Sequence, residues 1–358
     1  MGKAHAVAMS AVGATFGTVL RPVLEMVCAT SEQSAGRYQA AYGFNKSTTD
    51  WRELVESDRV DAVVIASPQE THREIALAAL ELGKPVLCEK PLGASLADST
   101  AMAEAAAKTG TINMVGFNYF RTPVTQFAKK IIADGTIGEI TWFRGEHTED
   151  FYADPDMPAT WRTIGQANGC MGDLSPHMIQ CALGLIGPIT RLSAEVETVI
   201  HKRPNGKGGF ADVGNDDQGQ MMCRFENGAM GHLYFSRVAT GRKMGYAYEI
   251  TGTKGAIRFD QEDQNAIWLY EMHGDNATRG FRKILAGPEH PDYLNFCQSP
   301  GHGTGYQDQI IIQAAQFLDA IATKTSAWPD FGVGLEVNRI VSAAHQSSQQ
   351  KSWVEVHR

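Results

Sequence analysis

The sequence predicts two domains, an α/β domain with a doubly wound parallel sheet followed by an α+β domain with a large antiparallel sheet. Three observations support this prediction. The chain has 358 residues, which exceeds the size at which single hydrophobic cores usually stop growing. Up to about residue 120 short apolar runs alternate with helical patterns. Beyond that point alternating strands dominate, so we place the domains at residues 1–120 and 121–358.

The first domain is predicted from β-α-β units. Its central strands lack polar alternation, as expected of parallel strands that helices cover on both faces. The predicted elements are a helix at 3–16, a strand at 24–29, a helix ending at 38–44, a strand at 62–66, a helix at 71–83, a strand at 85–88, a helix at 96–110 and a strand at 112–115. Thr71 can cap the helix that follows it, and Gly83 can end that helix.

The second domain is predicted from strands of mixed alternation that form one antiparallel sheet. These strands lie at 139–149, 191–200, 218–225, 229–237, 246–251 and 266–270. Hairpins are expected to reverse at Gly255 and at Glu226-Asn227-Gly228, where the Asn-Gly pair favours a tight turn. Amphipathic helices at 308–323 and 335–348 close the chain. One face of the sheet is left for a partner subunit, so a homo-oligomer is expected.

Composition excludes several classes of function. A formal charge of −8 without a basic run argues against nucleic acid as a partner. The six cysteines are scattered with no C-x-x-C pair, which argues against a disulfide framework or a zinc knuckle and fits a cytoplasmic protein. No stretch approaches a membrane span. The residues from Lys3 to Leu20 have features of a secretory signal, but polar and glycine residues dilute the apolar part.

Several short motifs give the chain a family resemblance. The strand at 85–88 runs into Glu89-Lys90-Pro91-Leu92, and a strand ending in E-K-P-L/I is the hallmark of the glucose-fructose oxidoreductase and inositol dehydrogenase (Gfo/Idh/MocA) family. The matching segments are Ala66-Ser67-Pro68 with His72, Gly116–Arg121, Gly135–Ile140, Trp161-Arg162 and Gly172–His177. In this order and spacing the chain resembles the family over nearly its whole length, and most of all its members that act on inositols and levoglucosan. The resemblance implies a Rossmann-type domain and an NAD(P)-dependent oxidoreductase.

The start of the chain departs from the family pattern. Family members open with a strand and G-x-G-x-x-G, commonly continued as M-G-K-x-H, and this chain begins Met1-Gly2-Lys3-Ala4-His5. Gly2 then corresponds to the third glycine, and the first strand and two glycines of the phosphate loop are missing from the sequence. Either the start was assigned to an internal methionine, or the protein works without a phosphate loop. If the sequence is whole, we expect a sheet without its first strand, a disordered or displaced amino end, and weak dinucleotide binding.

The chemistry of alcohol oxidation selects three catalytic candidates. It requires a base for the hydroxyl proton, a cation for the developing alkoxide and a nicotinamide near the carbinol carbon. Lys90 follows a buried parallel strand, where open α/β sheets bind ligands, although it could merely pair with Glu89. Asp173 and His177 are spaced i, i+4, so a helix beginning near Asp173 would place both on one face; alternatively, Asp173 is a helix cap and His177 an ordinary histidine. The resemblance implies that Lys90, Asp173 and His177 line the substrate site, with His177 as the base.

The resemblance also implies a set of cofactor contacts. They are Gly2, Ser31, Ser67, Pro68, His72, Glu89, Lys90, Asn118, Trp161 and Arg162. Pro68 and His72 are expected near the nicotinamide, although His72 could equally be an exposed residue at a helix start. At the end of the second strand, Ser31 stands where NAD enzymes usually carry an acidic residue, and Glu32 is adjacent. The expected cofactor is therefore NAD or NADP.

The expected substrate contacts are Lys90, Arg162, Asp173, His177 and His302. His302 lies in the glycine-rich segment 300–306, which is predicted to be either a flexible loop for hydroxyl recognition or a plain turn. Trp161-Arg162 could instead be a buried tryptophan beside a surface arginine. The acidic residues at 149, 150, 154 and 156 are interrupted by prolines and are read as a solvated loop, so no metal is expected.

These observations predict an NAD(P)-dependent dehydrogenase that moves a hydride between a nicotinamide and a secondary hydroxyl or ketone of a sugar or cyclic polyol. Two alternatives remain open. One is a non-catalytic sugar sensor of the same fold, although such a protein has no need for a base, a carboxylate and a cation together. The other is a reductase of a non-sugar carbonyl or imine.

Overall fold

The computed structural model describes residues 1–357, and the chain divides into two compact units. Unit 1 comprises Met1–Arg121 and Gly305–Leu335, and unit 2 comprises Thr122–Thr304 and Glu336–Arg358. The sequence prediction placed the boundary at residue 120 and assigned all later residues to the second domain, whereas Gly305–Leu335 returns to unit 1. None of the helices in the described residues has the length and apolar character needed to cross a membrane.

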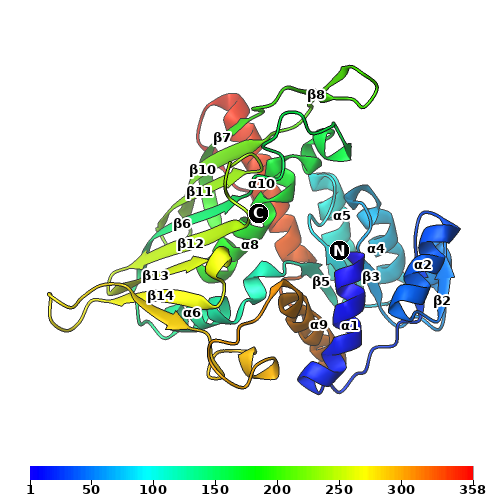
Figure 1. The fold of residues 1–358 in the computed structure, drawn as a ribbon, viewed down its shortest axis with the longest axis horizontal. Coiled ribbons are helices and arrows are strands. Elements are labelled where there is room, and N and C mark those ends of the chain that lie inside the picture. Colours follow the sequence, from blue (N-terminus) through cyan, green and yellow to red (C-terminus); the bar gives the residue numbers. More distant parts are fainter. Residues whose placement is uncertain (358) are drawn as a thin grey trace. The chain divides into compact units, whose positions relative to one another are not determined.

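Unit 1 alternates short strands and helices (Figure 1). Its elements are α1 (Gly2–Phe16), β1 (Met26–Cys28), α2 (Glu32–Tyr42), β2 (Lys46–Thr48), α3 (Trp51–Glu56), β3 (Val63–Ile65), α4 (His72–Glu81), β4 (Val86–Glu89), α5 (Leu96–Thr109), β5 (Asn113–Gly116) and α9 (Tyr306–Thr323). All strand pairs in it are parallel. The predicted α/β alternation is thus confirmed, and Gly83 follows α4 with a φ of 69° that ends the helix.

The parallel strands of unit 1 form two separate ladders. One ladder pairs β1 with β2, and the other has the order β3-β4-β5. Within the described residues no strand pairs with the second edge of β1 or of β3, which matches the expectation of a sheet without its first strand. The expected disorder of the amino end is wrong, because Gly2–Phe16 forms a complete helix. This helix packs against α9 and buries Ala8 and Val12, so a segment distant in sequence contributes to its apolar packing.

Unit 2 is built on one nine-stranded sheet with the order β15-β14-β13-β12-β6-β11-β10-β7-β16. Its strands are β6 (Ile140–Thr148), β7 (Ile189–Glu197), β10 (Gln218–Phe225), β11 (Met230–Ser236), β12 (Gly245–Gly252), β13 (Gly255–Asp260), β14 (Ala266–Glu271), β15 (Arg282–Leu285) and β16 (Val354–Glu355). A separate hairpin joins β8 (Lys202–Pro204) to β9 (Phe210–Asp212).

Two expectations for this sheet are corrected. It is mixed and not purely antiparallel, because β11 runs parallel to β6 while the other pairs are antiparallel. The reason is the long helical connection that follows β6. This connection leads to β7, the chain then continues through β10, and β11 finally lies beside β6. The second correction is β13, which begins at Gly255, where only a reversal was expected.

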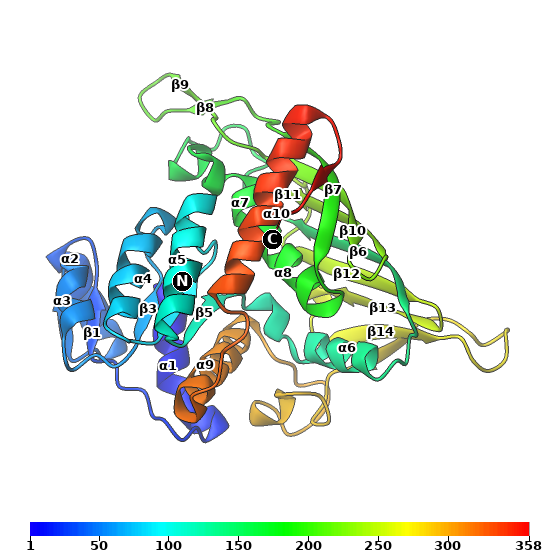
Figure 2. The same cartoon turned by 180° about the vertical axis from the view of Figure 1, so that it is seen from behind.

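Helices cover one face of the sheet (Figure 2). Contacts join α8 (Ser175–Leu185) to β6, and join α6 (Pro123–Ala133) to α8 and to β14. The helix α10 (Phe331–Gln350) reaches β7, the last strand but one of the sheet, where the hydroxyls of Ser347 and Ser348 accept hydrogen bonds from the N–H groups of Ala194 and Val196 at 2.9 and 3.0 Å. These bonds and β16 satisfy a strand edge that would otherwise be open.

Candidate active site

Lys90 stands directly after β4 and is half-buried. The side chain of the preceding Glu89 folds back, and its Oε2 accepts a hydrogen bond from the Lys90 N–H at 3.3 Å. Glu89 is in register with Gly116 of β5, and a Cβ at position 116 would lie 2.9 Å from Glu89 Oε1. Glycine at 116 therefore provides the space that the carboxylate occupies.

The carboxylate of Glu89 has a second partner in His5 of α1. His5 Nε2 lies 2.6 Å from Glu89 Oε1, and the two side chains are only 4% and 7% exposed. Burial by itself raises the pKa of Glu89, but the hydrogen bond from His5 and the charges of His5 and Lys90 outweigh it, so that the pKa is lowered. Glu89 is thus a buried, ionised group beside Lys90.

His72, the first residue of α4, is buried and its two ring nitrogens both face backbone carbonyl oxygens. Nδ1 lies 3.1 Å from the carbonyl oxygen of Pro91 and 3.2 Å from that of Leu92, while Nε2 lies 3.1 Å from the carbonyl oxygen of Ser67. The imidazole therefore ties the segment after β3 to the segment that follows Lys90. The alternative of an exposed histidine at a helix start is wrong.

The other cofactor candidates of unit 1 lie at strand ends or helix starts. Ser31 caps α2, where its hydroxyl oxygen accepts from the Ser34 N–H at 3.3 Å. Asn118 follows β5, is buried, and donates its amide to Gln309 Oε1 at 3.0 Å. Ser67 and Pro68 are exposed after β3, and the exposed Gly2 opens α1 with no atom within 4 Å of where a Cβ would lie.

This set of groups fits a dinucleotide. The strands β3, β4 and β5 are parallel, so Ser67, Lys90 and Asn118 follow the same edge of the ladder. Hydroxyl, ammonium and amide groups thus lie at the carboxyl ends of parallel strands, where open α/β sheets bind their ligands, and a bound nicotinamide dinucleotide would supply the hydride acceptor.

In unit 2, Asp173 and His177 lie on two successive helices and not on one. Asp173 ends the short helix α7 (Cys170–Asp173), Leu174 follows with φ −94° and ψ −43°, and α8 begins at Ser175. The expected single helix that carries both residues is therefore wrong, because α7 ends at Asp173 and α8 begins at Ser175, although Leu174 between them keeps right-handed helical φ and ψ. Pro176, which lacks a backbone N–H, sits in the first turn of α8, as helices tolerate.

An ion pair links Asp173 to Arg162, with Arg162 Nη1 3.0 Å from Asp173 Oδ2. The guanidinium also lies over the ring of Trp161, 4.3 Å from its centroid. Trp161 is 61% exposed, so the alternative of a buried tryptophan is wrong. The structure thus brings together two of the predicted site residues of unit 2 and leaves a large aromatic surface beside them.

His177 is buried on α8, and its ring stands edge-on to that of His147 with centroids 5.6 Å apart. His147 Nδ1 lies 2.9 Å from the carbonyl oxygen of Leu174, and its Nε2 lies 3.1 Å from Glu149 Oε1. The neighbouring imidazole of His147 is therefore fixed between the helix break and a carboxylate. Sequence reasoning missed His147, because its position in an alternating strand gave no sign of a partner on α8.

His302 is exposed on a loop whose backbone is held by hydrogen bonds at the two residues that follow it. Asn265 Oδ1 accepts from the Thr304 N–H at 2.7 Å, and the hydroxyl of Tyr293 accepts from the Gly303 N–H at 3.0 Å. Gly303 has a φ of 80°, and a Cβ there would lie 2.9 Å from Asn265 Nδ2, so glycine is required. Hydrogen bonds thus hold the backbone of the predicted loop, and the imidazole of His302 is exposed on it.

Three of the four acidic residues at 149, 150, 154 and 156 have partners for their carboxylates within the protein. Glu149 contacts His147, Asp150 pairs with Lys243 at 2.7 Å, and Asp154 Oδ1 accepts from the Asp156 N–H. The hydrogen bond from Lys243 lowers the pKa of Asp150 despite some burial. Among residues 1–357, no three His, Cys, Asp or Glu side chains are placed to hold a metal ion.

Comparison with known proteins identifies the family. A model of the oxidoreductase family with an NAD-binding Rossmann fold matches residues 1–117, and a model of the GFO/IDH/MocA C-terminal domain matches residues 125–258. The levoglucosan dehydrogenase of Pseudarthrobacter phenanthrenivorans is 36% identical over 99% of this chain and 95% of that protein. The chain belongs to the Gfo/Idh/MocA family of oxidoreductases. The predicted family and the fold class of a Rossmann domain followed by a large-sheet domain are confirmed, and of the two expected cofactors, NAD and NADP, the family match supports NAD.

Other Gfo/Idh/MocA proteins are similar over almost their whole length. The inositol 2-dehydrogenase of Rhizobium meliloti is 27% identical over 99% of this chain and 96% of that protein. The structure of a levoglucosan dehydrogenase in complex with NADH and levoglucosan is 37% identical, with a TM-score of 0.96 over 100% of this chain and 97% of that chain. An oxidoreductase domain protein from Kribbella flavida has the same TM-score of 0.96 and 37% identity, over 100% of this chain and 96% of that chain.

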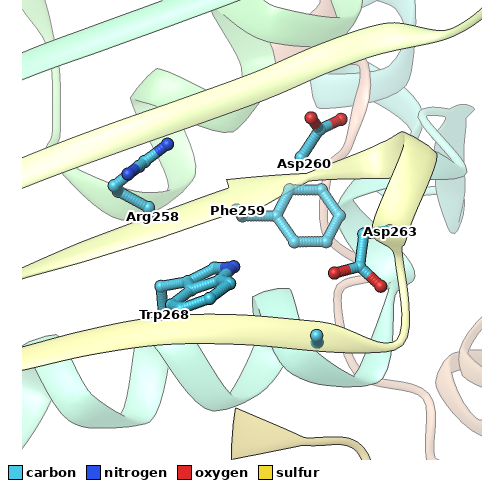
Figure 3. A pocket seen from close by; sticks show the side chains of 6 residues that line it. Arg258, Phe259, Asp260, Asp263 and Trp268 are labelled. Atoms are coloured by element: carbon cyan, nitrogen blue, oxygen red, sulfur yellow. The ribbon is translucent and has the colours of Figure 1, made fainter. Parts of the chain in front are cut away.

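Unit 2 also has a hollow of about 130 Å³ (Figure 3). It is lined by Arg258, Phe259, Asp260, Asp263, Ala266 and Trp268. Two of its three charged groups are already in ion pairs, since Arg258 lies 3.6 Å from Glu249 and Asp263 lies 2.5 Å from Lys283, and Asp260 Oδ1 accepts from the Glu262 N–H at 2.9 Å. No predicted site residue of this Gfo/Idh/MocA chain lines the hollow, so we do not assign it to catalysis.

Proposed function

We propose that this protein oxidises a secondary ring hydroxyl of an anhydrosugar or cyclic polyol, with levoglucosan as the first candidate and NAD⁺ as the acceptor. The observation that carries the proposal is the 36% identity to a levoglucosan dehydrogenase over 99% of this chain. The inositol 2-dehydrogenase, at 27% identity over the same share, supports the wider class of cyclic polyols.

Each catalytic candidate has a task in this reaction. Oxidation breaks the carbinol C–H bond and the O–H bond, and NAD⁺ when bound accepts the hydride. His177 accepts the hydroxyl proton, and Lys90 places its ammonium beside the oxygen that becomes negatively charged. Asp173, paired with Arg162 at 3.0 Å, holds a fixed carboxylate that orients the substrate hydroxyls.

The cofactor contacts remain part of the proposal. Ser67, Lys90 and Asn118 at the carboxyl ends of β3, β4 and β5 would hold the nicotinamide half. Gly2 at the start of α1 and Ser31 at the start of α2 would face the phosphate and ribose parts. His72 contributes indirectly, because its imidazole contacts the backbone carbonyls of Ser67 and Pro91 at 3.1 Å.

A substrate screen tests the proposal. Purified protein is mixed with NAD⁺ or NADP⁺ and with levoglucosan, inositols and aldoses, and the absorbance of the reduced nicotinamide is followed. We expect turnover with levoglucosan or an inositol, and none in Lys90→Ala or His177→Ala. Cofactor binding with no turnover of any polyol would support the sugar sensor. Turnover only of ketones or imines with reduced cofactor would support the reductase.

We also propose that the protein is a cytoplasmic homo-oligomer. The face of the nine-stranded sheet opposite α6 and α8 exposes Met222, Met230 and Trp268, which are 54%, 49% and 37% exposed. Large apolar side chains on an open sheet face support burial against a second copy. All six cysteines are free, which fits a reducing compartment.

A further inference from the structure

A buried guanidinium in unit 2 has every nitrogen engaged. Arg237 follows β11 and is 2% exposed. Its Nε donates to Asp217 Oδ1 at 2.9 Å, and its Nη2 donates to Asn215 Oδ1 at 2.8 Å. Its Nη1 donates to two backbone carbonyls, those of Arg162 at 2.9 Å and Asn168 at 3.1 Å. One side chain thus joins the 215–217 segment to both ends of the loop that carries Arg162.

The 214–217 segment also contacts the same loop directly. Asn215 Nδ2 donates to the carbonyls of Arg162 at 3.0 Å and Gly165 at 2.9 Å. Asp216 Oδ2 accepts from the Met171 N–H at 2.6 Å, at the start of the helix that ends at Asp173. A Cβ at position 169 would lie 2.5 Å from Asp216 Oδ1, so this close approach requires Gly169.

The anchor of this network is rigid. Asp217 is fully buried, and its Oδ2 accepts from the N–H groups of Val199 and Ile200 at 2.9 and 2.8 Å. The Arg237 N–H also bonds to the Asp217 carbonyl at 3.0 Å. Because Asp217 precedes β10 and Arg237 follows β11, two adjacent strands of the sheet fix the position of the guanidinium.

We propose that Arg237 is a positioning residue that sets the place of the Arg162–Asp173 ion pair. This inference rests on the proposed function, in which that pair orients the substrate. Arginine is needed because its planar fork directs donors to four acceptors at once, whereas a lysine ammonium is a single point with three donors. The network contacts the backbone of residue 162 and so fixes the position from which the Arg162 side chain extends. The guanidinium at the end of that side chain pairs with Asp173.

The chain offers a matched control in Arg203. Arg203 is also fully buried and lies over the same Tyr152 ring, with the two guanidinium carbons 4.7 and 5.1 Å from the ring centroid. Its hydrogen bonds go to the carbonyls of Tyr152 and Asp154, outside the loop that carries Arg162. Arg203→Lys therefore reproduces the loss of a buried guanidinium without releasing residue 162.

The test compares Arg237→Lys with Arg203→Lys, alone and with Arg162→Ala. A displacement of about 1 Å at a substrate-orienting group costs on the order of 100-fold in rate, so we expect that loss of kcat in Arg237→Lys. In the Arg162→Ala background the further loss from Arg237→Lys should be no more than about twofold, because the two changes act through one group. Asn215→Ala, which keeps the Arg237–Asp217 pair, should show the same pattern if Arg237→Lys folds poorly.

Amide hydrogen exchange supplies a readout that does not need turnover. Exchange at residues 163–171 should accelerate in Arg237→Lys and in Asn215→Ala, and remain at the wild-type rate in Arg203→Lys. Equal kcat losses in Arg237→Lys and Arg203→Lys, or losses that multiply fully with Arg162→Ala, would overturn the proposal. If the wild-type protein turns over no polyol, the proposed function fails, and unchanged exchange at 163–171 would separately show that Arg237 does not hold the loop.

Discussion

The buried pair of His5 and Glu89 allows a prediction of stability. The side chains lie 2.6 Å apart and are almost fully buried, so His5→Leu would leave the buried Glu89 carboxylate without its imidazole partner. Breaking a buried pair in this way costs about 3–5 kcal/mol. At about 2–4 °C per kcal/mol for a unit of this size, the melting temperature should fall by about 6–20 °C.

A double variant separates the charge from the packing. Replacing Glu89 by Met in the His5→Leu background removes the uncompensated carboxylate, and apolar substitution of both partners is often neutral. We therefore expect the double variant to recover most of the lost melting temperature in calorimetry or circular dichroism. A His5→Leu protein that melts within about 2 °C of the wild type would refute the reasoning, because this corresponds to only about 1 kcal/mol.

The pH dependence of the melting temperature gives an independent check of the direction in which the pKa of Glu89 is shifted. In the wild type the pKa of Glu89 is lowered, so its contribution to stability is present above the ordinary value of 4.5 and is lost as the pH falls below it. In His5→Leu the hydrogen bond is gone and burial raises the pKa, so the variant loses stability as the pH rises through the raised value. The gap in melting temperature should therefore be wider at about pH 8 than at about pH 4.

Three further predictions concern catalysis, acid stability and assembly. Lys90→Ala and His177→Ala should each nearly abolish turnover while cofactor affinity, measured by nicotinamide fluorescence, is kept; a variant retaining about a tenth of the activity would contradict the role of its residue. Hydrogen bonds from Arg59 and Asn45 lower the pKa of Glu25 to about 2, so its stabilisation is present above 4.5 and is lost between 4.5 and 2. Arg59→Ala should be less stable than the wild type at neutral pH in urea melts, and a gap that persists below about pH 2 would exclude this cause. Light scattering at micromolar concentration should detect an oligomer, and a charged substitution of the exposed Trp268 should dissociate it, whereas a monomeric wild type would rule out assembly through the sheet.

Much of the fold could be predicted because local patterns agree with it. The strand at 218–225 was predicted with its observed bounds, since its residues alternate between buried and exposed faces. The strand at 255–260 was missed, because Gly255 resembles a turn and only pairing with both neighbours makes it a strand. The parallel pairing of β6 with β11 depends on how a long connection returns, which no local pattern records.

Within the candidate site, only residues that belong to a recognisable sequence motif or follow a predicted strand could be predicted from the sequence. Lys90 follows a buried strand and could be found from that position, and Arg162 was found from a family motif. Arg237 and Asn215 were missed because they act through backbone carbonyls 50 or more residues away in sequence. The only signal for Arg237 is a charged residue immediately after a strand, which is usually a solvent-exposed end.

The network around Arg237 has a consequence for how such enzymes diversify. It contacts the 162–168 loop at the carbonyl oxygens of Arg162, Gly165 and Asn168, and so it is indifferent to the side chains that the loop displays. Exchange of the exposed side chains of Trp161 or Ile164, or of the Arg162 side chain, would therefore leave these main-chain contacts in place. Gly169 and Gly172 are the exceptions, because added Cβ atoms would lie 2.5 Å from Asp216 and 2.2 Å from the Ala167 carbonyl. Under the proposed function, single substitutions on this loop would change its contacts with the substrate while its backbone path is kept.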